Sequence, residues 1–195
     1  MNEDKEIKKA TELESIFRRV PKWQDLWFYQ KSEVLYQMTY VFCERFLPKH
    51  GDRTVDQMVQ AARSGKQNIV EGNADIETSL EMGIKLINVA KSSLRELLAD
   101  YEDFLRVNGF EQWQPNSDKY LAMRKLGREG DNADILNIAK SRPLDVVANM
   151  AIILLKQEDY LLHQFIASLS KRFLQEGGFK EKMFSLRQKV RYKGE

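Results

Sequence analysis

Apolar residues recur every three or four positions along four long stretches of the chain: residues 25–46, 54–71, 77–107 and 143–176. This spacing places apolar side chains on one face of a helix, so each stretch predicts a long amphipathic helix. In the fourth stretch, for example, Leu154, Leu161 and Phe165 share such a face. No segment alternates apolar and polar residues with the period of two that is typical of a half-buried strand.

Glycine and proline residues stand where helices commonly stop. The residues expected to follow or end the four helices are Pro48 with Gly51, Gly72, Asn108 with Gly109, and Gly177 with Gly178. Pro143 lies near the first turn of the fourth helix, a position that tolerates proline because no N–H is needed there. A short basic helix, residues 179–191, is expected after the fourth helix.

Residues 110–142 interrupt the helical pattern. They contain Pro115 and Gly127 together with several Asn and Asp residues, and these residue types favour turns. We expect short helical pieces at residues 117–125 and 133–139. A connection of this length is unusual between neighbouring helices of a bundle. We therefore predict an irregular excursion that is either partly ordered or a functional insertion.

Four long amphipathic helices without strands predict an all-α protein. The default arrangement is an antiparallel up-down four-helix bundle, here with a long excursion before the fourth helix and a short C-terminal helix. Residues 1–24 are then an N-terminal arm or short helix, residues 25–174 the bundle, and residues 175–195 a basic C-terminal suffix. The length of 195 residues fits one domain with such appendages.

The composition argues against several classes of chemistry. Cys43 is the only cysteine, which excludes a disulfide framework and a cysteine-based zinc finger. The two histidines, His50 and His163, have no glutamate three residues before them, although the di-iron sites of helix bundles use that pair. No phosphate-binding glycine loop or nucleophile elbow occurs. We therefore expect no metal, no cofactor and no enzymatic activity, and Cys43 is expected to be a small buried hydrophobe.

The chain shows no targeting segment. Residues 1–14 mix charges and have no apolar core of the kind found in signal peptides. The longest uncharged apolar run, residues 146–155, is far shorter than the roughly 20 residues that a membrane span needs. We expect a cytoplasmic protein.

The C-terminal end is basic although the whole chain has a net charge of only +2. Residues 171–195 carry eight basic and three acidic side chains. The tail cations that we consider for ligand binding are Lys180, Lys182, Arg187, Lys189, Arg191 and Lys193. Such a tail either binds phosphate groups or an acidic protein surface, or it is a solvated helix end whose cations suit the helix dipole.

The second helix carries residues that are unusual for a helix interior. Gly65 stands in mid-helix, where glycine costs about 1 kcal/mol against alanine. We expect it to let another helix approach closely, with Gly83 of the third helix serving the same contact. Asn68 and Glu71 need hydrogen-bond partners if they are buried, which favours a polar clamp inside the bundle or at a subunit seam.

A phosphate contact is the alternative function of this second helix. Arg63 and Lys66 are three positions apart in the sequence. Side chains with that spacing lie on the same face of a helix. The two cations therefore offer a small basic patch to a phosphate group, and the sequence leaves both alternatives open.

Several motifs of this chain resemble a known family. The second helix contains Ala62-Arg63-Ser64 and ends in Asn68-Ile69-Val70-Glu71-Gly72, and the third contains Ser93-Leu94-Arg95-Glu96-Leu97. The first helix opens with Leu26-Trp27-Phe28-Tyr29-Gln30-Lys31. Together these are similar to the four-helix-bundle family named for the protein encoded in intervening sequences of bacterial 23S ribosomal RNA genes, also called the S23 family. The resemblance covers residues 25–109, and the suffix after the fourth helix is similar to a longer subfamily.

The resemblance implies an up-down bundle that assembles as a ring-like homopentamer. One related class of proteins is the accessory factor of diversity-generating retroelements, which pairs with a reverse transcriptase and binds nucleic acid through a basic surface. The motif positions Asn68, Glu71, Gly72 and Glu96 are then structural residues.

The leading functional prediction is a non-enzymatic oligomeric adaptor that binds RNA, DNA or an enzyme acting on nucleic acid. The predicted contact residues are Arg63, Lys66 and the six tail cations named above. The alternative is a protein-only scaffold or docking ring without affinity for nucleic acid. An enzyme or cofactor protein is the least favoured class, because the ligands that such bundles use are missing.

Overall fold

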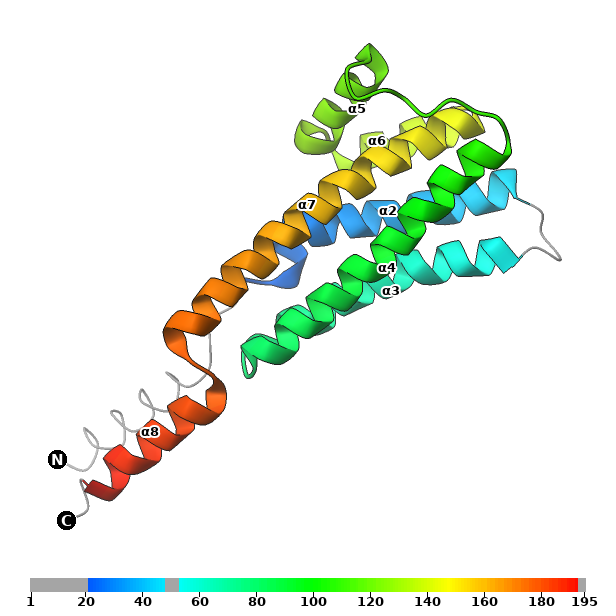
Figure 1. The fold of residues 1–195 in the computed structure, drawn as a ribbon. Helices are drawn as coiled ribbons and strands as arrows, with labels where there is room; N and C mark the ends of the chain where they lie inside the picture. Colours follow the sequence, from blue (N-terminus) through cyan, green and yellow to red (C-terminus); the bar gives the residue numbers. More distant parts are fainter. Residues whose placement is uncertain (1–20, 48–52, 193–195) are drawn as a thin grey trace.

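The computed structural model describes residues 21–47 and 53–192, and every regular element in these two ranges is a helix (Figure 1). The predicted all-α class is therefore confirmed. The predictions for residues 1–20, for Pro48, His50 and Gly51, and for Lys193 lie outside the described residues.

The chain begins its described part with a short 3-10 turn and then forms helices of very different lengths. In chain order these are η1 (Trp23–Asp25), α2 (Trp27–Phe46), α3 (Arg53–Asp75), α4 (Leu80–Val107), α5 (Asp118–Glu129), α6 (Asn132–Ser141), α7 (Leu144–Glu176) and α8 (Phe179–Tyr192). The expected helix ends at Asn108 and Gly177 are confirmed, since both residues are C-caps and Gly177 has a φ of +68°.

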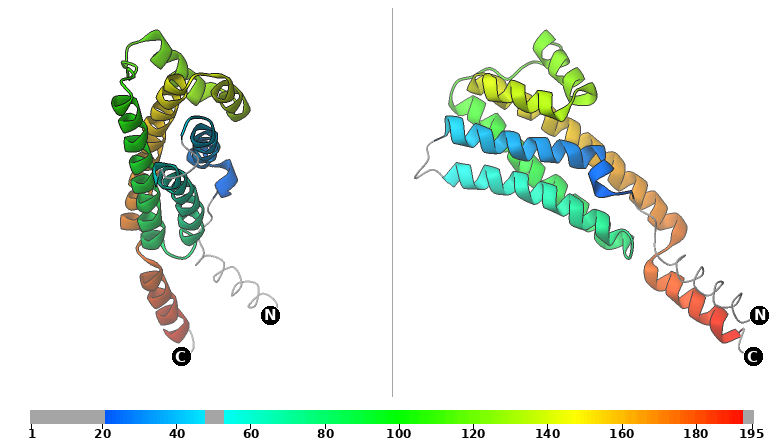
Figure 2. Two further views of the ribbon diagram at one scale, coloured as in Figure 1. Left: turned by 90° about the vertical axis from the view of Figure 1, so that its right-hand side faces the viewer. Right: turned by 180° about the vertical axis from the view of Figure 1, so that it is seen from behind.

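Four long helices enclose the main core. Helix α3 packs on α4, α4 packs on α7, and α2 packs on both α3 and α7 (Figure 2). The apolar faces that the sequence pattern predicted are turned inward, and the uncharged run at residues 146–155 lies in the buried first half of α7. Cys43 is also buried, as expected.

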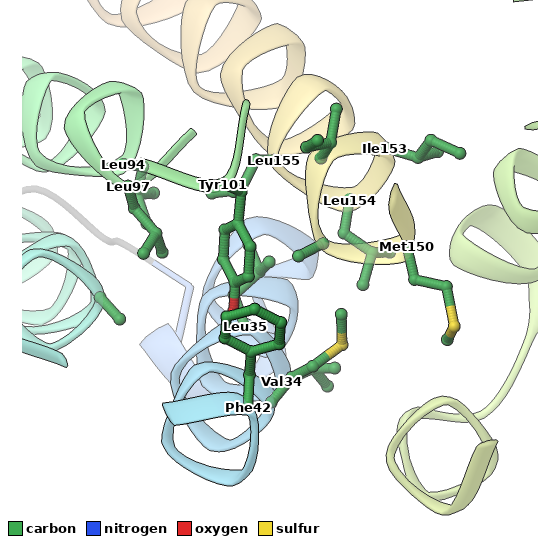
Figure 3. Close-up of a cluster of buried hydrophobic side chains, with 14 of the residues drawn as sticks. Val34, Leu35, Phe42, Leu94, Leu97, Tyr101, Met150, Ile153, Leu154 and Leu155 are labelled. Carbon is green, nitrogen blue, oxygen red and sulfur yellow. The ribbon is translucent and has the colours of Figure 1, made fainter. Parts of the chain in front are cut away.

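Tyr101 and Phe42 lie at the centre of this core. Figure 3 shows Tyr101 of α4 reaching between α2 and α7, where its ring meets the edge of Phe42 at a centroid distance of 5.0 Å. The Tyr101 hydroxyl donates to Thr39 Oγ1 at 3.1 Å, and both residues are fully buried. Burial of a large apolar side chain contributes roughly 1.5–3 kcal/mol, so these two rings stabilise the core where side chains of α2 and α4 meet.

The tight connection of α3 to α4 depends on two glycines. A Cβ atom on Gly83 would lie 2.9 Å from the carbonyl oxygen of Gly72, closer than side chains tolerate. The prediction that Gly72 ends the second helix is wrong, because α3 continues through it to Asp75. The predicted partnership of Gly65 with Gly83 is also wrong: Gly65 makes room for the side chain of Leu94 instead.

The stretch expected to be irregular contains two ordered helices. Helix α5 packs on α7, and α6 packs on α2, so the pair covers one side of α2 and α7 (Figure 1). Ser117 and Asp131 cap them, with side-chain oxygens that accept from Tyr120 N and Ala133 N. Both helices are longer than the short pieces that the sequence predicted, because N-caps and buried contacts extend them through the Gly- and Asn-rich sequence.

Helix α8 follows α7 after the two-residue break at Gly177 and Gly178 and confirms the expected short basic helix. It extends away from the layer formed by α2, α3 and α4 (Figures 1 and 2). Among the described residues, no helix has an extended contact with α8.

Candidate nucleic-acid interface

The two predicted phosphate contacts of α3 have different surroundings. Arg63 is exposed. Lys66 is half-buried, its ammonium lies 3.0 Å from a carboxylate oxygen of Glu33, and it stands 4.4 Å from the ring centroid of Tyr36. The charge of Lys66 is therefore engaged by α2, which leaves Arg63 as the exposed cation of the pair.

The polar motif of α3 does not form a clamp inside the bundle, and the alternative of a clamp at a subunit seam stays a prediction. The Asn68 amide donates to the carbonyl oxygen of Ser64 at 2.9 Å, within its own helix, and Glu71 is exposed. The polar contact between α3 and α4 is made instead by Ser64 and Ser93, whose hydroxyl oxygens are 3.1 Å apart. Short hydroxyl side chains thus make the polar contact where the two helices pack closely.

The remaining two motif residues, Gly72 and Glu96, have different surroundings. Gly72 makes the close approach to Gly83 described above. Glu96 is exposed on α4. Arg95, next to it, binds Asp159 of α7 through two hydrogen bonds of 2.5 and 3.2 Å.

The basic tail residues lie in α8. Arg187 and Arg191 are exposed. Lys180, Lys182 and Lys189 belong to the same helix, and Lys193 lies beyond its described end.

The sequence did not point to a cleft of about 490 Å³ that α5 and α7 form together with the first turns of α2. A volume of this size is in the range of small-molecule and nucleotide sites. The residues that line it are Trp27, Lys31, Tyr120, Arg124, Arg128, Ile153, Lys156, Gln157, Tyr160 and Leu161. We refer to it as the aromatic–basic cleft.

Two aromatic side chains of the aromatic–basic cleft are largely exposed. Trp27 of α2 has 61% of its surface accessible, and Tyr160 of α7 has 63%. Tyr120 of α5 is half-buried beside them. Large aromatic rings are usually covered in a folded protein, and rings gathered on one cleft offer flat apolar faces to a ligand.

Cations surround these rings. Arg124 and Arg128 are exposed on α5, and Lys156 lies on α7. Arg128 is paired with its neighbour Glu129 at 2.5 Å, and Lys156 with Glu102 at 2.9 Å. These exposed pairs are weak in water, so an incoming phosphate can compete for the same cations.

Gln157 and Lys31 hold α5 in place at the base of the cleft. The Gln157 amide donates to the carbonyl oxygen of Arg124 at 2.7 Å. The Lys31 ammonium donates to the carbonyl oxygen of Gly127. Gly127 permits the close approach of α5 to α7, because a Cβ atom there would lie 2.7 Å from a methyl carbon of Leu154. These contacts attach α5 to both α2 and α7 beneath the cleft.

Glu158 lies beneath the cleft and is fully buried, with neither carboxyl oxygen hydrogen-bonded among the described residues. Burial raises the pKa of the Glu158 carboxyl well above its usual range, and the Lys31 ammonium opposes that shift. Burial likewise lowers the pKa of Lys31, against the opposing effect of Glu158. Each group therefore depends on the other to remain charged.

A pattern in the sequence could have indicated the cleft. Tyr120, Arg124 and Arg128 are spaced by four residues, and so are Lys156 and Tyr160. Residues four apart share a helix face, so each run is an aromatic–basic stripe. The sequence does not show that α5 packs beside α7, so that the two stripes line the same cleft.

Residues 21–47 and 53–192 contain neither a metal-ligand cluster nor a helix suited to a membrane. Within these ranges, no group of three or more His, Cys, Asp or Glu side chains is placed to hold a metal ion. None of the helices described there combines the length and the apolar character needed to cross a membrane.

Comparisons with protein-family models, with curated proteins and with solved structures found no match to this chain. The resemblance to the S23 family therefore stays a prediction from the motifs of α2, α3 and α4.

Proposed function

We propose that the protein is a non-enzymatic adaptor that binds single-stranded nucleic acid in the aromatic–basic cleft. The observation that carries this proposal is that two largely exposed aromatic rings, Trp27 and Tyr160, and the cations of α5 and α7 line one cleft. Proteins that bind single strands without reading the sequence combine aromatic platforms with a basic groove.

The rings and the cations have separate roles in this proposal. Unpaired bases stack on Trp27 and Tyr160, and each stacked base contributes roughly 1–3 kcal/mol. Arg124, Arg128 and Lys156 neutralise phosphates, which releases counterions and makes the affinity salt-dependent. A duplex keeps its bases stacked internally and cannot use the rings, so single strands are preferred.

The proposal also includes the arrangement of the four long helices and the assembly of several copies of the chain. We propose that α2, α3, α4 and α7 constitute an up-down four-helix bundle of the S23 type, and that copies of it assemble into a homo-oligomer, a pentamer by resemblance. The pairwise packing of these four helices and the motif contact of Ser93 with Ser64 support the bundle. An enzyme that acts on nucleic acid, such as a reverse transcriptase, is the protein partner that the resemblance implies.

The test is a titration of the full-length protein with fluorescently labelled oligonucleotides, read by anisotropy. The probes are single-stranded oligo-U, single-stranded oligo-dT and a mixed-sequence duplex of equal length, each at low and at physiological salt. We expect both single strands to bind more tightly than the duplex, and all binding to weaken as salt rises. Equal affinity for duplex and single strand, or affinity that salt does not change, contradicts the proposal.

A protein-only scaffold is the second candidate function. It is favoured by a groove on α3 and α4 whose charged lining residues are all acidic, because such a surface repels nucleic acid. If the protein has native helicity and binds none of the oligonucleotides at low salt, the result favours this second function.

A further inference from the structure

An open groove of about 960 Å³ lies along the first half of α3 and is separate from the aromatic–basic cleft. Val55 and Val59 of α3 and Tyr40 of α2 supply apolar lining. Asp56 of α3 and Glu96 and Asp100 of α4 supply the charges. We call this surface the acidic groove.

The carboxylates of the acidic groove have no neutralising cation among the residues that line it. Burial raises the pKa of the Asp100 carboxyl, and the nearby carboxylates of Asp103 and Glu96 raise it further. The groove thus holds unbalanced negative charge beside apolar side chains. A partner that carries cations around an apolar side chain would neutralise this charge and cover the apolar lining.

Helix α8 offers that combination. Phe184 is 63% exposed, and Arg187 and Arg191 are also exposed. These three residues are three and seven positions apart, so they lie on one helix face. The face spans about 10 Å at 1.5 Å per residue, which fits the two to three turns of α3 that line the groove.

We propose that α8 of one copy of the chain docks in the acidic groove of a second copy. Phe184 packs on the Val55 and Val59 side of the groove. Arg187 and Arg191 lie opposite the carboxylates of Glu96 and Asp100. The occupant comes from another copy because α8 extends beyond the end of the helical layer opposite to the start of α3 (Figure 1).

The contact joins two different surfaces of the chain. In a pair of copies, the copy that supplies α8 therefore keeps a free groove, and the copy that supplies the groove keeps a free α8. Such head-to-tail contacts form a closed ring or an open chain. The inference uses neither Trp27 nor Tyr160 and does not depend on the nucleic-acid proposal. A negative result for the docking of α8 therefore does not contradict the nucleic-acid proposal, and a negative result for nucleic-acid binding does not contradict the docking of α8.

The experiment compares the mass of full-length variants by sedimentation equilibrium at micromolar concentration. One variant reverses the groove charge (Glu96→Lys with Asp100→Lys), and another reverses the helix charge (Arg187→Glu with Arg191→Glu). The matched control, Glu77→Lys with Glu81→Lys, changes the net charge as much as the groove variant but lies near the start of α4. Helicity measured by circular dichroism verifies that each variant is folded.

We expect each reversed variant to self-associate at least about tenfold more weakly than the wild-type protein, and the control to associate as the wild type does. An equimolar mixture of the two reversed variants restores association, because a basic groove then meets an acidic α8. A monomeric wild-type protein, or association unaffected by either reversal, overturns the inference. Retained self-association with lost oligonucleotide binding in the α8 variant also overturns it, and assigns α8 to nucleic acid.

Discussion

Lys31 of α2 reaches the backbone of α5 and donates a hydrogen bond to the carbonyl oxygen of Gly127. The side chain is 8% exposed, so this bond forms almost entirely out of water. It joins helices that lie far apart in the sequence, and the buried Glu158 is the electrostatic partner of the Lys31 ammonium. The relationship explains how a short helix in a Gly- and Asn-rich segment is held against the long helices.

Substitution Lys31→Met tests this role. It leaves the carbonyl of Gly127 without its donor and the Glu158 carboxyl without its opposing charge. Removal of one partner of a buried polar pair is expected to lower the free energy of unfolding by about 2–4 kcal/mol. Urea denaturation monitored by circular dichroism measures the loss.

The double variant Lys31→Met with Glu158→Leu is the control for that interpretation. Replacement of both buried polar groups by apolar ones is often neutral, so the double variant is expected to be more stable than Lys31→Met alone. A double variant that is less stable than the single one would show that the two side chains act independently.

Glu158 predicts a specific dependence of stability on pH. Its pKa is raised in the folded protein from an ordinary value of 4.5, so the native state holds this proton more tightly than the unfolded state does. The stabilisation from the proton is therefore fully present below the unfolded pKa and is lost as pH rises toward the folded pKa.

The measurement is the free energy of unfolding against pH for the wild-type protein and for Glu158→Gln, which mimics the protonated carboxyl. The difference between the two proteins is expected to widen as pH rises above about 4.5, with Glu158→Gln the more stable. A constant difference across this range would mean that the carboxyl titrates alike in both states.

The contact of Gly83 with Gly72 predicts a steric penalty. Gly83→Ala places a methyl group 2.9 Å from the carbonyl oxygen of Gly72, so α3 and α4 must separate. Overpacking of this kind is expected to destabilise by about 1–3 kcal/mol. Gly178→Ala is the matched control, since the nearest atom to its added carbon is 3.8 Å away. Thermal melting of both variants gives the comparison, and equal melting temperatures would contradict the close contact.

Arg124 predicts a change in salt dependence. In the proposed complex it neutralises one phosphate, so Arg124→Gln is expected to lower the slope of log affinity against log salt by about 0.7 for a single strand. Arg63→Gln removes an exposed arginine of α3 that does not line the cleft and is the matched control. An unchanged slope for Arg124→Gln, or an equal change for Arg63→Gln, would place the phosphate contacts elsewhere.

The local pattern of the sequence predicted the helices well because each long helix buries one apolar face. Leu154 and Tyr101, for example, lie in the core as their spacing required. Gly72 misled the prediction, since glycine serves both to end a helix and to let two helices meet. Only the position of Gly83 on the facing helix separates these roles, and that pairing is a tertiary property.

The aromatic–basic cleft was missed for a related reason. Tyr120, Arg124 and Tyr160 each belong to a visible helix stripe, but one stripe lies in a segment that glycine and proline marked as irregular. The buried contact of Lys31 with Gly127 fixes where that segment packs, and no local period encodes it. The basic tail was easier to see because a run of charges needs no tertiary contact to be recognised.

In the proposed complex, the exposed rings of Trp27 and Tyr160 bind unpaired bases. The most direct measurement is the affinity of wild-type protein, Trp27→Ala, Tyr160→Ala and the control Tyr40→Ala for the same single-stranded oligo-U. Loss of one stacked base at 1–3 kcal/mol predicts a decrease in affinity of about 5- to 150-fold for each cleft variant, and no change for Tyr40→Ala. Wild-type affinity in both cleft variants, with native helicity retained, would contradict the claim.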